Sequence, residues 1–157
     1  MTIKLLVVGK TGNKALEGLI LDYVHRLKHY VRFEMHTIPQ LKNTKNLSQI
    51  EQKAKEGELI LKQLEISDYL ILLDENGKQY DSVDFSGYLQ KKMNSGLKNL
   101  IFIIGGPYGF DEMVKERSET SVSLSKMTFP HQIVRLFFVE QLYRAFTILK
   151  NEPYHHQ

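Results

Sequence analysis

The amino-acid sequence predicts an α/β fold with one parallel sheet and helices on both of its faces. Apolar runs of strand length alternate with segments of helical periodicity along the whole chain. A helix separates successive strands, an order that makes connected strands parallel. The chain of 157 residues has the size of one domain and contains no internal repeat, so we expect a single domain over residues 1–157.

The first strand, residues 2–8, is a nearly continuous apolar run that Gly9 ends, which is typical of a strand buried on both faces. Over residues 13–29, apolar side chains recur at helical spacing and basic side chains occupy the other side, which predicts an amphipathic helix. Residues 31–38 alternate between apolar and polar side chains, as a strand does, and Pro39 closes this second strand.

A polar segment over residues 40–46 follows, and we assign it no chemistry. Ser48 with Glu51 three residues later forms a capping box, which predicts a helix over residues 48–64. Residues 69–73 form the next buried strand, and a turn with the sequence D-E-N-G follows it directly.

A helix is expected over residues 82–95, with Gly96 as its C-terminal cap. The most apolar strand, residues 100–104, runs into the glycine-rich turn G-G-P-Y-G-F-D. A short helix over residues 111–118 comes next. The last helix is expected over residues 130–150, with a proline in its first turn, where the missing N–H costs nothing.

This last helix is apolar around most of its circumference, far beyond the stripe that a surface helix needs. One face can pack on the sheet of its own chain, and the remaining apolar surface of the helix must be covered by something else. A second copy of the chain around a two-fold axis is the simplest cover, and a fully internal helix is the alternative.

The composition is that of a soluble globular protein, with 42% hydrophobic and 25% charged residues. The chain has no cysteine, which excludes disulfides and thiolate metal sites and fits a reducing compartment. The N-terminal apolar run is too short for a secretion signal, and no later run approaches the length that spans a bilayer. We therefore expect a cytoplasmic protein without a membrane segment.

The formal charge of +3 is unevenly distributed. Residues 1–32 carry six basic and two acidic side chains, whereas residues 66–157 carry ten basic and eleven acidic ones. A basic N-terminal part suggests attraction to a polyanion such as nucleic acid, and a merely solvated helix face explains the same pattern equally well.

Residues 121–132, S-V-S-L-S-K-M-T-F-P-H-Q, have an unusual composition for a connection between elements. Hydroxyl and apolar side chains alternate, so polar groups should lie in a half-buried setting, where each needs a partner. A bound ligand would supply such partners. A buried strand whose hydroxyls bond neighbouring carbonyls is the alternative, and the residues alone leave both open.

Ligands of open α/β sheets bind outside the carboxyl ends of the strands. Three such ends are informative here: Leu73 with residues 74–77, residues 105–109, and the segment that begins at Leu124. The glycine pair at 105 and 106 lets a ligand approach the backbone, although such pairs also end strands where nothing binds.

Several classes of site are excluded by their missing motifs. No G-x-G-x-x-G follows the first strand, and V-G-K-T-G lacks the spacing of a phosphate loop. These absences argue against dinucleotide enzymes, nucleotide triphosphatases and the commoner methyltransferase fold. The six histidines show no metal-ligand spacing, so we expect no metal.

Several segments together resemble the RlmH family: I-G-G-P-Y-G-F from Ile104, S-L-S-K-M-T-F-P-H-Q from Ser123, R-L-F-F-V-E-Q-L-Y-R-A-F from Arg135 and P-Y-H-H from Pro153. The opening I-K-L-L-V-V-G-K is similar too, so the resemblance covers nearly the whole chain. It implies a SPOUT-type α/β fold with a C-terminal deep trefoil knot, a topology that the usual rules for connections would not predict. It also implies a homodimer that uses S-adenosylmethionine to methylate N3 of a pseudouridine in 23S ribosomal RNA, within the assembled ribosome.

Carried over position by position, the resemblance implies these cofactor contacts: Leu73, Gly105, Leu124, Ser125, Lys126, Met127, Thr128 and Phe129. The chemistry of these residues agrees with that assignment. Apolar Leu73, Met127 and Phe129 would enclose the adenine, and backbone groups of residues 124–129 would satisfy its edge. Gly105 would allow close approach beside the ribose.

The acceptor nitrogen must lose a proton, for which His131, Tyr154 and His155 are candidate bases. We expect the tail of one subunit to reach the acceptor base at the other, with Arg135 and Arg144 holding phosphate or substrate. A local role at the helix N-terminus is the alternative for His131, and an interface ion pair is the alternative for Arg144.

Two other functions remain open at this point. One is a non-catalytic module of the same fold that binds the ribosome or RNA, which binding of S-adenosylmethionine would distinguish. The other is a methyltransferase acting on tRNA, against which the whole-length resemblance and the lack of an added RNA-binding domain both weigh. So small a protein needs the ribosome to supply much of the recognition surface.

Overall fold

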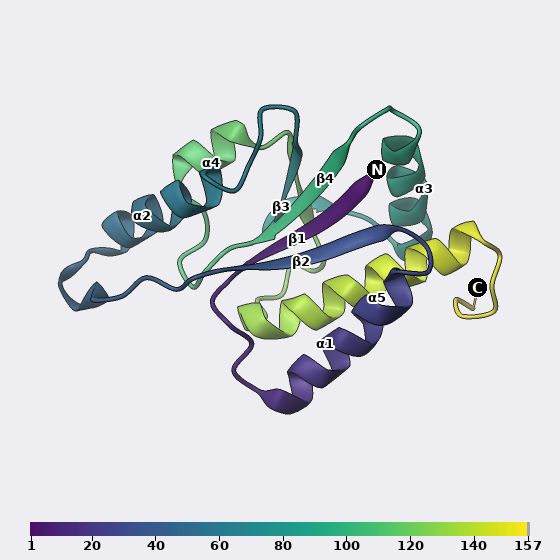
Figure 1. The fold of residues 1–157 in the computed structure, drawn as a ribbon, viewed down its shortest axis with the longest axis horizontal. Coiled ribbons are helices and arrows are strands. Elements are labelled where there is room, and N and C mark those ends of the chain that lie inside the picture. The colour runs from purple at the N-terminus through teal and green to yellow at the C-terminus, as the bar shows by residue number, and fades with distance from the viewer. Residues whose placement is uncertain (157) are drawn as a thin grey trace.

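A computed structural model describes residues 1–156, and Gln157, the last residue of the expected domain, lies outside the described residues. The described chain forms a five-stranded sheet in the order β2-β1-β4-β3-β5 (Figure 1). Every neighbouring pair of strands is parallel. The strands are β1 Thr2–Val8, β2 Arg32–Ile38, β3 Tyr69–Gln79, β4 Asn99–Ile104 and β5 Thr120–Ser123.

The helices lie on both faces of this sheet, which confirms the predicted α/β architecture (Figure 1). They are α1 Lys14–Leu27, α2 Gln49–Leu61, α3 Ser82–Met93, α4 Glu112–Arg117 and α5 His131–Leu149, with a short 3₁₀ turn, η1, at Thr44–Asn46. The helices α1, α3 and α5 pack on one face, and α2 and α4 pack on the other.

Local sequence explains where four of these helices begin. Asn13, Ser48, Asp81 and Asp111 each precede a helix, and each side chain accepts a backbone N–H of the first turn. At Ser48 the predicted capping box is complete, because the Glu51 side chain also accepts the Ser48 N–H.

The molecule has two hydrophobic cores, one on each face of the sheet, and strands that are apolar at successive positions contribute side chains to both. In β1, Leu5 and Val7 face the core beneath α1 and α5, whereas Leu6 and Val8 face the core beneath α2 and α4. The interior strands β1 and β4 are thus buried on both faces, as the apolar run predicted for β1. In the larger core, the rings of Phe102 and Phe138 lie 4.7 Å apart and join β4 to α5.

Three local predictions need correction. The strand predicted to end at Leu73 continues to Gln79, and both Leu73 and Lys78 pair with Val122, so the D-E-N-G sequence is a bulge within β3. Pro130 is the N-cap of α5 and does not lie in its first turn. The C-cap of α3 is Asn94, and Gly96 takes a left-handed φ of 80° two residues later.

Residues 121–132 divide into two parts. Val122 and Ser123 are buried in the sheet as the end of β5, which is the edge strand. Residues 124–130, here termed the crossing segment, leave the sheet and lead to α5. The start of α5 is fixed beside the turn after β1, where the Gly12 N–H donates to Gln132 Oε1 at 3.0 Å. The crossing segment therefore passes the carboxyl ends of β3 and β4.

The β3 bulge requires glycine at residue 77. A Cβ there would lie 2.7 Å from both Ser121 C and Val122 N, which are backbone atoms of β5. We expect Gly77→Ala to lower the free energy of unfolding by about 1–3 kcal/mol, because the strands must separate to admit the methyl group. Denaturation in urea, followed by circular dichroism, measures this difference.

The matched control is Gly87→Ala in α3, where a Cβ would meet nothing within 4 Å. This variant should be more stable than the unmodified chain by about 0.5–1 kcal/mol, since alanine favours the helix. Equal midpoints for the two variants would show that the bulge tolerates a side chain.

Candidate functional site

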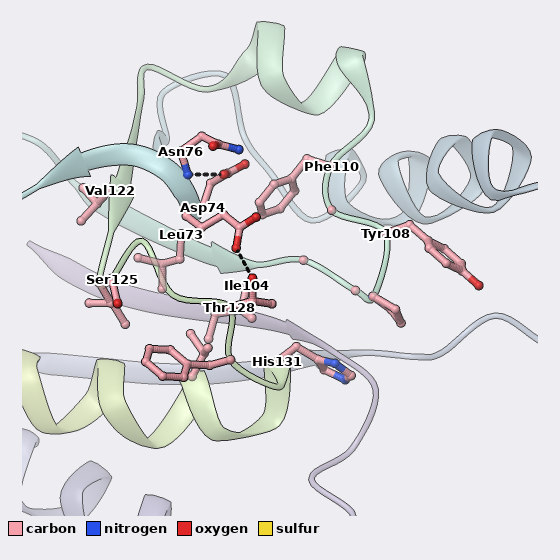
Figure 2. Close-up of a pocket in the computed structure, with 18 of the residues that line it drawn as sticks. Leu73, Asp74, Asn76, Ile104, Tyr108, Phe110, Val122, Ser125, Thr128 and His131 are labelled. Atoms are coloured by element: carbon pink, nitrogen blue, oxygen red, sulfur yellow. Dashed lines mark hydrogen bonds between the residues drawn. The ribbon is translucent and has the colours of Figure 1, made fainter.

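A cavity of about 440 Å³ lies at the carboxyl edge of the sheet, between the β3 bulge, the ends of β4 and β5 and the start of α5 (Figure 2). The register explains the position, because Leu73 pairs with Ile104 of β4 on one side and with Val122 of β5 on the other. The chain therefore leaves the sheet after β4 and β5 and bulges out of it after Leu73, so the three segments singled out by the sequence do lie side by side, although the strand containing Leu73 does not end there. The cavity is lined by Lys53, Leu73, Asp74, Glu75, Asn76, Ile104, Gly105, Gly106, Pro107, Tyr108, Gly109, Phe110, Lys115, Val122, Leu124, Ser125, Met127, Thr128, Phe129, His131 and Val134.

The side of the cavity at β4 is backbone next to an aromatic ring. Gly105 is buried, and a Cβ on it would lie 3.1 Å from Cε1 of Phe110. A larger residue would have to displace this ring. The glycine thus keeps Phe110 in the wall and leaves the backbone of β4 accessible to a ligand.

Polar contacts fix the opposite side. The Asp74 carboxylate accepts the Asn76 N–H at 2.8 Å, which holds the bulge of β3 in place. The Thr128 hydroxyl donates to Glu75 Oε2 at 2.9 Å and so ties the crossing segment to that bulge (Figure 2). Two segments distant in sequence therefore form one continuous wall.

The hydroxyls of Ser123, at the end of β5, and of Ser125 and Thr128, in the crossing segment, bond to groups of the protein itself. Ser123 Oγ donates to the Ser125 carbonyl at 2.9 Å, and Ser125 Oγ accepts the Met127 N–H at 3.0 Å. In the part of the chain that the structure describes, the backbone N–H groups of Lys126, Thr128 and Phe129 donate to no protein acceptor. Of these three residues, Thr128 and Phe129 line the cavity.

His131 lies at the start of α5 and contributes to the cavity wall. Burial lowers the pKa of its imidazole, and the nearby positive charge of Arg135 lowers it further. The ring is therefore neutral near pH 7 and can accept a proton. Figure 2 shows it directed outward from the helix, on the side of the site where Tyr108 lies.

Arg135 lies inside the protein, with an exposed fraction of 1%, and does not line the cavity. Its Nη2 donates to the Val8 carbonyl at 2.7 Å, and its Nη1 donates to Thr11 Oγ1 at 3.0 Å. Burial lowers the pKa of the guanidinium. The residue expected to hold phosphate or substrate thus connects α5 to the end of β1.

Tyr154 and His155 lie away from the cavity, against α1 and α5 of their own chain. The Tyr154 hydroxyl lies 3.0 Å from Glu140 Oε1 and 3.2 Å from the Tyr23 hydroxyl. Burial raises the pKa of Tyr154, and both hydrogen bonds raise it further, so the phenol stays protonated at neutral pH. His155 Nδ1 lies 3.2 Å from Nη1 of Arg144.

Arg144 lines a second cavity, of about 810 Å³, on the other side of the crossing segment. Its guanidinium pairs with Glu140 one turn earlier in α5, which raises the pKa of Arg144. The two cavities share Val122, Leu124, Ser125 and Phe129 as lining residues. The wall between them is therefore the end of β5 and the crossing segment.

The predicted cofactor residues gather at the first cavity with one exception. Lys126 does not line it, and Met127 lines it although its exposed fraction is 72%. Sequence reasoning missed Phe110, Lys53 and Lys115. Phe110 belongs to the glycine-rich turn, so the sequence pattern could have predicted it as a lining residue. The two lysines come from α2 and α4 and share no motif with the other lining residues.

Residues 1–156 contain no group of three or more His, Cys, Asp or Glu side chains able to hold a metal ion. Over the same residues, none of the helices combines the length and the apolar character needed to cross a membrane.

Comparison with known proteins gives one consistent result. The family described as "Predicted SPOUT methyltransferase" matches residues 1–155. A Christiangramia forsetii protein named ribosomal RNA large subunit methyltransferase H is 65% identical over 157 residues, with both chains covered completely. Proteins of the same name from Flavobacterium johnsoniae and Parabacteroides distasonis are 63% and 57% identical over the same full length. The similarity thus includes every segment that forms the cavity.

The buried position of Arg135 leads to a test of its role. We expect Arg135→Met to lower the free energy of unfolding by about 2–4 kcal/mol, because the Val8 carbonyl loses a charged donor. Arg144→Met, which removes a partly exposed ion pair, should cost about 1 kcal/mol or less. Chemical denaturation of both variants gives the comparison. An Arg135→Met protein with unchanged stability and weakened RNA binding would instead place this guanidinium at the substrate.

Proposed function

The chain belongs to the SPOUT methyltransferase family, and from this premise we propose that it transfers a methyl group from S-adenosylmethionine to large-subunit ribosomal RNA. The observation that carries the proposal is the cavity between the β3 bulge, the end of β4 and the crossing segment. The names of the relatives support ribosomal RNA of the large subunit as the substrate. The resemblance of the motifs supports the finer assignment, N3 of a pseudouridine in 23S ribosomal RNA within the ribosome.

The residues of the cavity fit S-adenosylmethionine in size and chemistry. A volume of about 440 Å³ lies in the range of small-molecule sites, which is roughly 300–1,000 Å³. Leu73, Ile104 and Phe129 offer apolar surface to the adenine, and the free N–H groups of the crossing segment are suited to the acceptors on its edge. Asp74 and Glu75 place negative charge where a cation with an ammonium and a sulfonium would bind.

When bound, S-adenosylmethionine supplies an electrophilic methyl group on its sulfonium. The protein's own contribution is to position that methyl group in line with the acceptor nitrogen, because in-line displacement depends strongly on alignment. The Thr128 hydrogen bond to Glu75 holds one wall of the cavity in place, and the packing of Gly105 against Phe110 holds the other.

The acceptor nitrogen carries a proton, and His131 is the best placed of the three candidate bases. His131 lines the cavity, and its imidazole is neutral at pH 7 because its pKa is lowered. Tyr154 keeps its proton at this pH and is suited to donate a hydrogen bond. We assign His155 and Arg144 to holding the substrate near the site, since both lie at the second cavity or beside it.

The apolar surface around the second cavity is suited to contact with a second copy of the chain. Leu19 and Phe137 line it and remain 54% and 40% exposed, and the ring of Phe129 packs edge-on against Phe137 at 5.3 Å. Ile133 on α5 is also 37% exposed. This apolar surface supports a homodimer in which each subunit covers the α5 of the other.

The route of the chain supports the knotted topology that the resemblance implies. The crossing segment starts at the edge strand β5, passes two intervening strands and leads to the start of α5, where Gln132 meets Gly12. We infer that this passage threads the chain beneath the connections that follow β3 and β4, which forms the trefoil knot. A cytoplasmic location, where ribosomes are found, follows from the proposed substrate.

Binding and methyl transfer test the proposed function directly. We expect the protein to bind S-adenosylmethionine in calorimetry and to transfer its labelled methyl group to unmethylated ribosomes. Isolated subunits and free ribosomal RNA should be poorer substrates.

Gly105→Val should abolish binding, because its side chain would enter the wall held by Phe110. Gly18→Ala, at an exposed position with nothing within 4 Å, is the matched control. Absence of binding by the unmodified protein would favour a non-catalytic RNA-binding module.

The division of the candidate bases between two places gives a further prediction. His131→Ala should lower kcat by about 100-fold or more while S-adenosylmethionine still binds. The acid limb of the unmodified protein's pH–rate profile should have its midpoint below the ordinary pKa of histidine, since the neutral ring is the base. Truncation after Pro153, which removes Tyr154 and His155, should lower the rate comparably. Full rates for both variants would contradict these roles.

A mixture of the two variants tests whether the tail acts across the dimer. In a hybrid dimer, the truncated subunit keeps His131, and the His131→Ala subunit supplies an intact tail. If the tail acts at its partner's site, mixing two inactive proteins restores part of the rate. If the tail acts within its own subunit, the mixture stays inactive.

A further inference from the structure

The side chain of Glu56 is a buried carboxyl group whose hydrogen bond goes to the backbone of the cavity wall. Glu56 lies in α2 and has an exposed fraction of 7%. Its Oε1 accepts the N–H of Gly106 at 3.1 Å. Gly106 follows Gly105, so this bond reaches the glycine-rich turn from the side away from the crossing segment. A carboxyl group is costly to bury, and this one has a specific partner.

The backbone at Gly106 is pressed directly against this carboxyl group. A Cβ on Gly106 would lie 2.7 Å from Oε2, 2.8 Å from Oε1 and 3.0 Å from the side-chain carbon of Glu56 that carries them. Any other residue at this position would therefore push the carboxyl group away. The contact depends on the absence of a side chain at Gly106.

A second glycine brings α2 close enough for this contact. A Cβ on Gly57 would lie 3.2 Å from both Asp111 Cβ and Val114 Cγ2, so α2 lies directly against the start of α4. The helix α4 follows the glycine-rich turn in sequence. The turn is thus held at its far end by the packing of α2 on α4, and near its start by Glu56.

Glu56 does not itself line the main cavity. It lines a smaller, more enclosed cavity of about 120 Å³ on the other side of the turn, to which Pro107 and His131 also contribute. Any effect of Glu56 on a ligand in the main cavity must therefore pass through the backbone of the turn. Burial raises the pKa of Glu56, which is consistent with a carboxyl group held in a confined place.

We propose that Glu56 is a positioning residue for the cofactor: its carboxyl group fixes the Gly106 N–H and thereby sets the Gly105 backbone in the wall of the cavity. This inference rests on the proposed function. Two adjacent glycines have many accessible backbone conformations, and a ligand that ordered them on binding would lose affinity. A carboxyl group that orders them beforehand removes this cost.

Three variants of α2 test the role of the accepted hydrogen bond. Glu56→Leu removes the acceptor, Glu56→Gln keeps an acceptor oxygen without the charge, and Glu58→Leu changes an exposed carboxylate of the same helix. Calorimetry gives the Kd for S-adenosylmethionine, and kcat is measured on ribosomes at saturating cofactor. Hydrogen exchange monitored by NMR reports the protection of the Gly106 amide.

We expect Glu56→Leu to raise the Kd about tenfold or more, with kcat at saturating cofactor within about threefold of the unmodified protein. The Gly106 amide should exchange faster in this variant. Glu56→Gln and Glu58→Leu should stay within about threefold in Kd and keep the amide protected. An unchanged Kd in folded Glu56→Leu would overturn the proposal, as would a Glu56→Gln protein as weak as Glu56→Leu.

A second pair of variants applies if Glu56→Leu does not fold. Gly106→Ala should weaken cofactor binding strongly in the unmodified background and much less in a Glu56→Ala background, because the new methyl group meets the carboxyl group itself. Equal losses in both backgrounds would overturn the proposal. Failure of the unmodified protein to bind S-adenosylmethionine would instead contradict the proposed function. The exchange rate of the Gly106 amide would still show whether Glu56 holds the turn.

Discussion

The hydrogen bond from buried Arg135 to the Val8 carbonyl is the contact on which the arrangement of the site depends. It fixes the first turns of α5 beside the end of β1, although the chain enters α5 from the edge strand β5 on the other side of β3 and β4. The crossing segment must therefore pass over the ends of these two strands, and that passage encloses the cavity. A guanidinium suits this task because it is rigid and carries several donors, of which one also reaches Thr11.

Glu56 has the corresponding position at the opposite wall. Arg135 acts from beneath the start of α5, and Glu56 acts from beneath the glycine-rich turn, so a buried ionisable group supports each wall from behind. Buried charges contribute little net stability, since desolvation offsets most of the attraction. What they provide is one defined geometry, because a backbone group moved away from either side chain would leave an unpaired polar group in the interior. The start of α5 and the glycine-rich turn are accordingly in place before any ligand enters.

The sequence predicted most of the elements and the three segments that meet at the cavity, because these features depend on local pattern. Apolar runs predicted the strands β1 and β4, and the capping box at Ser48 placed the start of α2 correctly. The roles of Arg135 and Glu56 were not accessible in this way. Their hydrogen bonds join residues 127 and 50 positions apart. The partners, the Val8 carbonyl and the Gly106 N–H, are backbone groups, so no pattern of side chains in the sequence indicates them. The β3 bulge escaped prediction for a similar reason, since only its pairing with Val122 shows that Lys78 rejoins the strand.

The crossing segment also links the two cavities, and this has a consequence for the proposed dimer. Leu124, Ser125 and Phe129 line both, so a group that fills the second cavity presses on the same backbone that would hold the cofactor. The segment has few contacts of its own, chiefly the Thr128 bond to Glu75 and the packing of Phe129 on Phe137. A partner subunit that covers Phe137 would therefore add contacts to the crossing segment, which has few contacts within its own chain. Dimer formation and cofactor binding would then favour one another, because each orders the same few residues and the second to occur finds that ordering already complete.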